Sequence, residues 1–387
     1  LFFEKGDLQT DRGVDRQCGD IWFQACVGNA QTNAPINYSH NLYVELIGPG
    51  AKMFRRKTIR LENGLGNGDF KLTATIPAGR YRLRAYTNWM RNFGDNFIFE
   101  KNITVLQTAK VAAAATIKKN KRATAKATAT VNAPAVTVNF YPEGGSLVEG
   151  ISSIVGVKAE DGYGKGIAVR GIVLSSAGDT VSRFNCDSLG MGLLVLLPIK
   201  GLSYRAIVNI YDGMLTGREY NGLQFELPPA LSKGLTLQVK QTDSVIHLAV
   251  NSSNLSTADK VYLAVKHGGK TQLSKSLQLQ NQQAAVKIPT VSLPEGISAI
   301  TLYNGQHKPE CERLVYIQHP DSKNILSIAT DEKSYQPKGQ VTVNIKTLPN
   351  TSLSLAAVDA MAVPVQEENI LSYLNLQSEI KGYIENP

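Results

Sequence analysis

The chain has 387 residues, of which 43% are hydrophobic and 19% are charged. This composition excludes a chain that is disordered throughout, and the length predicts two to four domains of roughly 100–200 residues each. The net charge is +9, but the acid-free stretch from Lys110 to Lys126 supplies six of the positive charges. No run of the sequence approaches the roughly 20 apolar residues that a membrane-spanning helix needs.

The first predicted strand begins near Asp20, and the most regular pattern follows between Asn41 and Met90. Period-two alternation of apolar residues between Gly, Pro and Asn is typical of antiparallel strands with one solvent-exposed face. These residues predict a small β-sandwich over residues 1–107, with turns at GPG, NGLGNG and PAG. The alternating apolar positions are Leu42, Val44, Leu46, Phe70, Leu72, Tyr81, Leu83 and Ala85.

Residues 108–134 consist mainly of Ala, Thr and Lys. They predict an interdomain linker, with a short exposed helix as the alternative. Short alternating segments at regular spacing then predict two further sandwiches, over residues 135–230 and 231–321.

A partial fourth module is expected over residues 322–387, with strands in ILSIAT, VTVNIKT and LSLAAVDA before a helix. Glu367 and Glu368 complement the dipole at the start of that helix, and Gly382 can end it. The predicted fold class is therefore all-β, with tandem antiparallel β-sandwiches and one short C-terminal helix.

One sequence pattern recurs near the two ends of the chain. Thr10, Asp11 and Gly19 align without a gap with Thr330, Asp331 and Gly339, and an apolar strand segment follows each Gly. Such a shared entrance to a strand indicates a repeated domain type.

These residues, together with YVELIGPG and PAGRYRLRAYTNWMRNFG, resemble the macroglobulin-like (MG2-type) domains of the alpha-2-macroglobulin superfamily. More closely, the chain resembles the region of large Bacteroidetes envelope proteins that precedes a TonB-receptor-type plug. Residues 140–166, 293–317 and 368–387 also carry the resemblance. It implies immunoglobulin-like sandwiches in the cell envelope, at the periplasm or the outer-membrane surface. It also implies a protein partner, for which an outer-membrane receptor or a surface protein is a candidate.

No catalytic residue, metal site or cofactor is expected. The superfamily's covalent trapping depends on a thioester in a CGEQ motif, and this sequence lacks that motif. The four cysteines, Cys18, Cys26, Cys186 and Cys311, are expected to be free and mostly buried thiols. The segment from His307 to Cys311 offers mixed donor atoms but is interpreted as a hairpin tip, and GYGKG at 162–166 as a hairpin turn.

Two segments are candidates for binding. Trp89, Arg91, Phe93 and Phe97 lie close together in a turn-rich segment, and Trp and Arg are typical interface anchors. The alternative is that these aromatic residues close the end of the first sandwich. The basic linker could contact anionic lipids or polyanions, or it could be a solvated spacer; its central charges are Lys118, Lys119, Lys121 and Arg122. Nucleic-acid binding is not expected, because the linker has no interleaved aromatic residues.

The leading functional hypothesis is a non-catalytic binding or scaffolding module of the cell envelope, associated with an outer-membrane TonB-dependent receptor system. The alternative is a protease-trapping fragment that lacks the thioester and uses residues 108–134 as its cleavable segment. An enzyme on a β scaffold would require acidic side chains that converge in a pocket.

Overall fold

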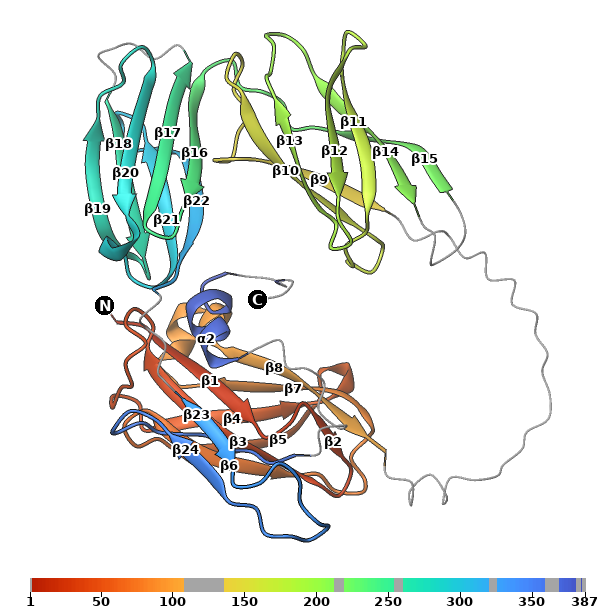
Figure 1. The fold of residues 1–387 in the computed structure, drawn as a ribbon, viewed down its shortest axis with the longest axis vertical. Coiled ribbons are helices and arrows are strands. Elements are labelled where there is room, and N and C mark those ends of the chain that lie inside the picture. Colours follow the sequence, from red (N-terminus) through yellow and green to blue (C-terminus); the bar gives the residue numbers. More distant parts are fainter. Residues whose placement is uncertain are drawn as a thin grey trace, which may run out of the picture. The chain divides into compact units, whose positions relative to one another are not determined.

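The computed structural model describes residues 2–107, 136–211, 219–253, 260–319, 326–358, 369–380 and 384. The chain divides into two compact units, one formed by Leu1–Asn120 with Gln318–Pro387 and one formed by Lys121–Ile317. Regular structure in the described parts is mostly antiparallel β-strand, with a few short 3-10 turns and one short α-helical segment near the C-terminus (Figure 1). This confirms the predicted fold class. The predicted linker at 108–134, with its four basic candidates, lies outside the described residues.

The first sandwich consists of a three-stranded and a five-stranded sheet. The smaller sheet has the order β1 (Glu4–Thr10), β3 (Asp20–Asn29) and β6 (Leu65–Lys71). The larger sheet has the order β2 (Val14–Arg16), β8 (Phe99–Leu106), β7 (Gly79–Tyr86), β4 (Asn41–Ile47) and β5 (Met53–Arg60). All eight alternating apolar residues that the sequence singled out are buried in the core between these sheets.

Two details of the first sandwich differ from the prediction. The strands β1 and β2 both precede Asp20, where the sequence predicted the first strand. The prediction missed β1 because this strand is rich in polar residues and shows no apolar alternation. The tight turn of NGLGNG is confined to Asn63 and Gly64, which adopt φ angles of 51° and 76°, whereas Gly66 and Gly68 lie within β6. A side chain at Gly64 would place Cβ only 2.2 Å from the carbonyl oxygen of Val27, so this position requires Gly.

The second sandwich is a continuous ribbon of seven strands folded into two layers. Its order is β15 (Glu219–Glu226), β14 (Tyr204–Tyr211), β11 (Val169–Ser175), β12 (Thr180–Cys186), β13 (Met191–Leu196), β10 (Ser153–Glu160) and β9 (Thr137–Pro142). The strands β12 and β13 pair at a single position, Cys186 with Gly192, where the ribbon turns. Phe140 of β9 therefore packs against Phe184 of β12 across the core, with 5.9 Å between the ring centroids.

The third sandwich packs a three-stranded sheet on a four-stranded one. The first sheet has the order β16 (Gly234–Gln241), β17 (Val245–Ser253) and β20 (Gln283–Pro289). The second has the order β19 (Lys270–Leu277), β18 (Val261–His267), β21 (Gly296–Tyr303) and β22 (Pro309–Ile317). The cysteine Cys311 is part of the core that these sheets enclose.

A polar junction connects the second and third sandwiches. The carboxylate of Glu143, just after β9, accepts a hydrogen bond from the Val239 N–H at 3.0 Å and lies 3.4 Å from the guanidinium of Arg313. The carbonyl of Gly144 accepts from the Glu312 N–H at 3.2 Å. Glu143 and Gly144 of the second sandwich therefore contact two strands of the third, β16 and β22. These contacts hold the two sandwiches together.

The C-terminal part repeats the first hairpin of the chain. The strands β23 (Ser327–Thr330) and β24 (Val343–Lys346) pair so that Thr330 faces Val343, as Thr10 faces Phe23 between β1 and β3. This confirms the recurrence that the sequence predicted. Downstream the prediction is wrong, because residues 353–358 of LSLAAVDA form no strand.

The C-terminal helix is short and well capped. It comprises α2 (Ile370–Ser372) and a π-helical turn, Tyr373–Gln377. The Asn369 side chain accepts from two backbone N–H groups, and the Ser372 hydroxyl accepts from the Asn369 N–H, so the two residues form a capping box. The helix thus begins after Asn369, whereas Glu367, Glu368 and Gly382 lie outside the described residues.

Replacing Leu194 and Leu193 separately by Ala tests the layering of the second sandwich. Leu194 is 3% exposed and faces the core, whereas Leu193, the next residue of β13, is 68% exposed. We expect Leu194→Ala to destabilise this sandwich by about 2–5 kcal/mol, and Leu193→Ala to change its stability by less than about 0.5 kcal/mol. Hydrogen–deuterium exchange of β10 and β13 measures both effects. Equal losses of protection would contradict the assigned faces.

Candidate functional site

The predicted aromatic segment packs against the N-terminus of the chain. Trp89 stacks on Phe2 with 5.1 Å between the ring centroids, and its indole Nε1 donates to the Phe2 carbonyl at 3.2 Å. Phe97 stacks on Phe3 at 5.3 Å, and Phe93 meets the same ring edge-on at 4.8 Å. The three predicted aromatic residues are therefore gathered into one partly buried cluster at the end of the first sandwich.

A buried carboxylate holds the segment that carries this aromatic cluster. Glu4 of β1 is fully buried and accepts hydrogen bonds from the hydroxyls of Ser39 at 2.8 Å and of Thr87 at 2.5 Å. The Thr87 hydroxyl in turn accepts from the Met90 N–H at 3.2 Å. A buried charge is tolerated only when hydrogen bonds satisfy it, so this network fixes the segment that carries the aromatic rings.

Arg91, the fourth predicted binding residue, lies on a different surface. Its guanidinium is exposed and lies 6.0 Å from the centroid of the Tyr86 ring. Tyr86 belongs to the outer side of the five-stranded sheet, where arginines alternate along β7 and β5. We call this outer side the arginine face, and its arginines are Arg56, Arg60, Arg80, Arg82 and Arg84.

One buried acid organises the arginine face. Glu45 of β4 is 6% exposed, and its carboxylate accepts from Arg84 Nε at 3.1 Å and from the Tyr86 hydroxyl at 2.8 Å. Arg56 Nε lies 3.7 Å from the same carboxylate, and its guanidinium covers the Tyr43 ring at 4.7 Å. Burial, together with the hydrogen bond to Glu45, raises the pKa of Tyr86.

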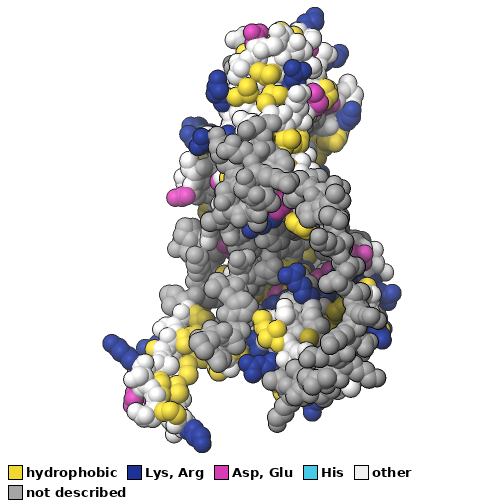
Figure 2. All heavy atoms as spheres, turned by 90° about the vertical axis from the view of Figure 1, so that its right-hand side faces the viewer, with side chains coloured by type: hydrophobic (Ala, Val, Ile, Leu, Met, Phe, Trp, Pro, Cys, Tyr) yellow, Lys and Arg dark blue, Asp and Glu magenta, His cyan; other side chains and the backbone are white. Residues whose placement is uncertain are grey.

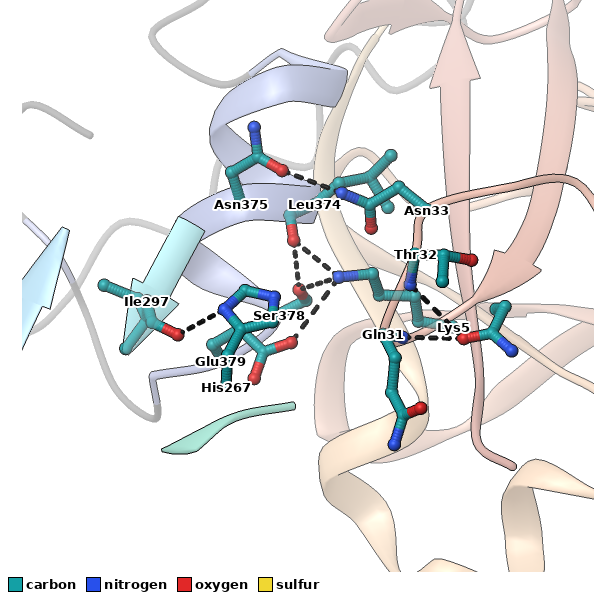
Figure 3. Close-up of polar contacts among 11 residues, drawn as sticks. Lys5, Gln31, Thr32, Asn33, His267, Ile297, Leu374, Asn375, Ser378 and Glu379 are labelled. Atoms are coloured by element: carbon teal, nitrogen blue, oxygen red, sulfur yellow. Dashed lines mark hydrogen bonds and ion pairs between the residues drawn. The ribbon is translucent and has the colours of Figure 1, made fainter. Parts of the chain in front are cut away.

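The C-terminal helix docks onto the first strand of the same unit (Figure 3). The ammonium of Lys5 in β1 is buried and donates to the Leu374 carbonyl at 2.6 Å, and it lies 3.3 Å from Ser378 Oγ and 3.5 Å from Glu379 Oε1. Burial lowers the pKa of Lys5, and the Glu379 carboxylate opposes that shift. Residues more than 360 positions apart in the sequence thus share one buried polar site.

Further contacts secure the helix beside Lys5. Asn33 Nδ2 donates to Asn375 Oδ1 at 2.9 Å, and Tyr373 packs edge-on against Phe99 at 5.0 Å. Burial raises the pKa of Tyr373. Between the helix and β1 remains a cavity of about 120 Å³ that includes Asp7 and Lys101 in its lining. It is smaller than the roughly 300–1,000 Å³ of typical ligand pockets, so we assign the joint a structural role.

The second sandwich exposes an apolar sheet surface. It lies on the outer side of β9, β10 and β13 and contains an open hollow of about 690 Å³ at Gly156. We call this surface the apolar face, and its exposed residues are Tyr141, Ile154, Met191, Leu193 and Val195. In the space-filling view, hydrophobic side chains reach the described surface in several places, with Lys and Arg side chains around them (Figure 2).

The two buried cysteines and His307 lie in positions where their side chains take part in packing. Burial raises the pKa of Cys186 to about 11 and of Cys311 to about 12, so both thiols are unreactive at neutral pH. All four cysteines are free, as predicted; Cys186 and Cys311 are buried, Cys26 is half-buried and Cys18 is exposed. His307 lies in the turn between β21 and β22 and stacks on Tyr262 at 4.6 Å, which confirms the predicted hairpin tip. Within the described ranges no three His, Cys, Asp or Glu side chains form a metal-binding group, and no helix has the length and hydropathy to span a membrane.

Asp15 of β2 is a buried acid with one partner. Its Oδ1 lies 3.1 Å from Arg12 Nε, whereas Oδ2 is buried without a hydrogen-bond partner among the described residues. Burial outweighs the attraction of Arg12 and raises the pKa of Asp15 to about 6.

The sequence pointed to the aromatic segment but not to the other surfaces. The alternation of Arg80, Arg82 and Arg84 in GRYRLRAY was a readable sign of a basic sheet face. In GLLVLLP, apolar residues at successive positions similarly signal a strand that is apolar on both sides. No local pattern signals the pairing of Lys5 with residues near the C-terminus.

We expect Lys5→Met to loosen the C-terminal helix, because it removes the charged donor that the Leu374 carbonyl and the Glu379 carboxylate share. A lost charged hydrogen bond corresponds to about tenfold faster amide exchange over residues 373–380. Hydrogen–deuterium exchange measures this change, with exposed Lys71→Met as the control. Unchanged exchange of the helix in Lys5→Met would show that apolar packing alone holds it.

The raised pKa of Asp15 predicts a pH effect on the first sandwich. Between about pH 4 and pH 6 the folded state binds more protons than the unfolded state, so the free energy of unfolding falls as the pH rises. We expect Asp15→Asn to remove this fall, which is on the order of 2 kcal/mol, and to be at least as stable as the wild type at pH 7. Urea unfolding followed by Trp fluorescence reports on this sandwich, since Trp22 and Trp89 both belong to it. Exposed Asp95→Asn in the same sandwich is the control, and an unaltered pH profile in Asp15→Asn would disprove the assignment.

Comparisons with known proteins give similarity at the level of solved structures alone. No protein-family model and no curated protein sequence matches the chain. Elastase-activated alpha-2-macroglobulin from Escherichia coli matches at 13% identity and a TM-score of 0.30, over 89% of this chain and 33% of that one. Methylamine-reacted alpha-2-macroglobulin from Salmonella gives 12% and 0.23, over 88% and 25%. Dimeric latent PorU from Porphyromonas gingivalis gives 10% and 0.28, over 82% and 34%.

The chain thus spans about a quarter to a third of the length of these proteins. The link to a TonB-type receptor stays a prediction.

Proposed function

We propose that the chain is a non-catalytic binding or scaffolding module of the cell envelope, whose tandem β-sandwiches present surfaces to a protein partner. An outer-membrane TonB-dependent receptor system is the partner that the sequence resemblance suggests. The observation that carries the proposal is the apolar face on β9, β10 and β13. Contiguous exposed apolar surface in a folded domain is typical of sites that bind other proteins.

The energetics of the apolar face support a protein partner. Removing one exposed Leu or Val side chain from water contributes about 1.5–3 kcal/mol, so a partner that covers several of them gains appreciable affinity. The hollow at Gly156 makes part of the apolar face concave, because Tyr141 and Leu193 line it on either side of the glycine. A side chain from the partner can enter there without moving the sheet.

The junction at Glu143 supports a scaffolding role. Its bonds to Val239 and Arg313 link the second sandwich directly to the third. The apolar face is therefore presented by a pair of connected domains, which lowers the entropy lost when a partner binds.

The protease-trapping alternative depends on residues 108–134, which lie outside the described residues. No contact within the described ranges favours it over the binding module.

Capture from intact envelopes tests the proposal. We expect the wild-type chain to retain a defined outer-membrane protein, identified by mass spectrometry, and Leu193→Arg to lose it by more than about tenfold, because an unpaired charge would be buried on binding. Val291→Arg is the control, since Val291 is also strongly exposed but lies in the third sandwich. Retention of the same protein by Leu193→Arg would refute the role of the apolar face.

A further inference from the structure

The strand β5 has an open edge with its hydrogen-bonding groups available. Among the described strands it pairs only with β4, and it ends the order of its sheet. The Leu61 N–H donates to the His40 carbonyl at 2.8 Å, which extends the register in which Asn41 faces Arg60. Hydrogen-bonded pairs alternate along an antiparallel ladder. The backbone N–H and C=O groups of Arg56 and Thr58 therefore point away from β4.

The side chains of this edge are strongly basic. Within Met53–Arg60 there are four positive residues and no acid: Arg55, Arg56, Lys57 and Arg60. Arg56 and Arg60 lie on the arginine face, and Arg60 is 81% exposed on its side chain. A second copy of β5 would place like charges opposite one another, which is destabilising. The edge of β5 therefore disfavours pairing with a second copy of β5 and favours pairing with an acidic strand.

The aromatic rings beside the edge argue against a nucleic acid as the occupant. Binding of single strands uses free ring faces on which bases stack. The guanidinium of Arg56 covers Tyr43, that of Arg84 lies 5.4 Å from the Tyr86 centroid, and the two rings stack on each other at 5.7 Å. The chemistry that remains exposed is arginine, which binds carboxylates through paired N–H groups.

We propose that the open edge of β5 pairs with an extended acidic segment of a partner protein, whose carboxylates contact Arg56 and Arg60. Backbone bonds to Arg56 and Thr58 supply sequence-independent affinity, and the arginines select acidic residues at alternate positions of the added strand. The proposal rests on the proposed binding function, but it uses a different sandwich from the apolar face.

The probe is a fluorescent, end-capped peptide of alternating Glu and Val, as long as β5. Anisotropy titration with the full chain measures its affinity, and the matched peptide of alternating Lys and Val is the charge control. We expect binding of the acidic peptide that weakens as salt is raised, and at least about tenfold weaker binding of the basic one. Equal binding of both peptides, or none of the acidic one, overturns the proposal.

Thr58→Pro and Thr58→Ala separate strand pairing from charge attraction. Proline removes the outward N–H and is tolerated on edge strands, so the sandwich remains folded, which Trp fluorescence verifies. We expect Thr58→Pro to weaken acidic-peptide binding about tenfold and Thr58→Ala to change it less than about twofold. Unaltered affinity in folded Thr58→Pro contradicts strand addition.

Arg60→Glu and Arg183→Glu test the contribution of the arginine face. Arg60 forms its ion pair with the exposed Glu62, whereas Glu45 pairs with Arg56 and Arg84, so reversing Arg60 leaves the Glu45 network intact. We expect Arg60→Glu to weaken binding several-fold and to lessen its salt dependence, whereas Arg183→Glu on β12 leaves both unchanged. Equal effects of the two reversals would show a non-specific charge effect and overturn the proposal. Loss of envelope capture by Leu193→Arg is independent of these results, so failure of either proposal is recognised separately.

Discussion

Most of the described strands of the three sandwiches have an apolar side that packs against a second sheet layer, and this packing forms the three cores. Across the second sandwich, Phe140 and Phe184 meet because the ribbon turns at the single pairing of Cys186 with Gly192. The outer side of β13 has the same kind of residues without a layer over them. The inner and outer sides of β13 therefore carry similar apolar residues, and only the inner side is covered by a second sheet layer.

The recurring hairpin shows that this local structure forms whether or not its side chains are buried. Asp11 Oδ1 accepts from the Trp22 N–H at 3.3 Å, and Asp331 Oδ1 accepts from the Thr342 N–H at 3.0 Å. Leu8 in the first copy is 1% exposed, whereas Ile328 at the equivalent position is 57% exposed. The same hydrogen bonds thus form in a buried and in an exposed setting. Side-chain chemistry at the turn, rather than the core, determines this hairpin.

The recurrence also shows why some elements could be predicted and others could not. ILSIAT was recognised as a strand because its apolar residues are frequent, whereas β1, its counterpart, has Glu4, Lys5 and Asp7 in buried positions. These polar residues are buried because distant residues satisfy them: Thr87 binds Glu4, and the C-terminal helix binds Lys5. Sequence periodicity reports on local alternation and contains no information about such partners. The strand cores were therefore predictable, and the polar joints between distant segments were not.

The arginine face illustrates how a buried acid can create a basic surface. Arg56 and Arg84 lie on neighbouring strands on either side of β4, where two like charges would repel each other. Glu45 lies between them and is within 3.7 Å of both guanidinium groups, so it offsets that repulsion while contributing almost no exposed negative charge. The arginines are also held over Tyr43 and Tyr86, which restricts their rotamers before any partner arrives. Because less side-chain entropy is then lost on binding, a carboxylate that reaches this surface meets a site that is already arranged for it.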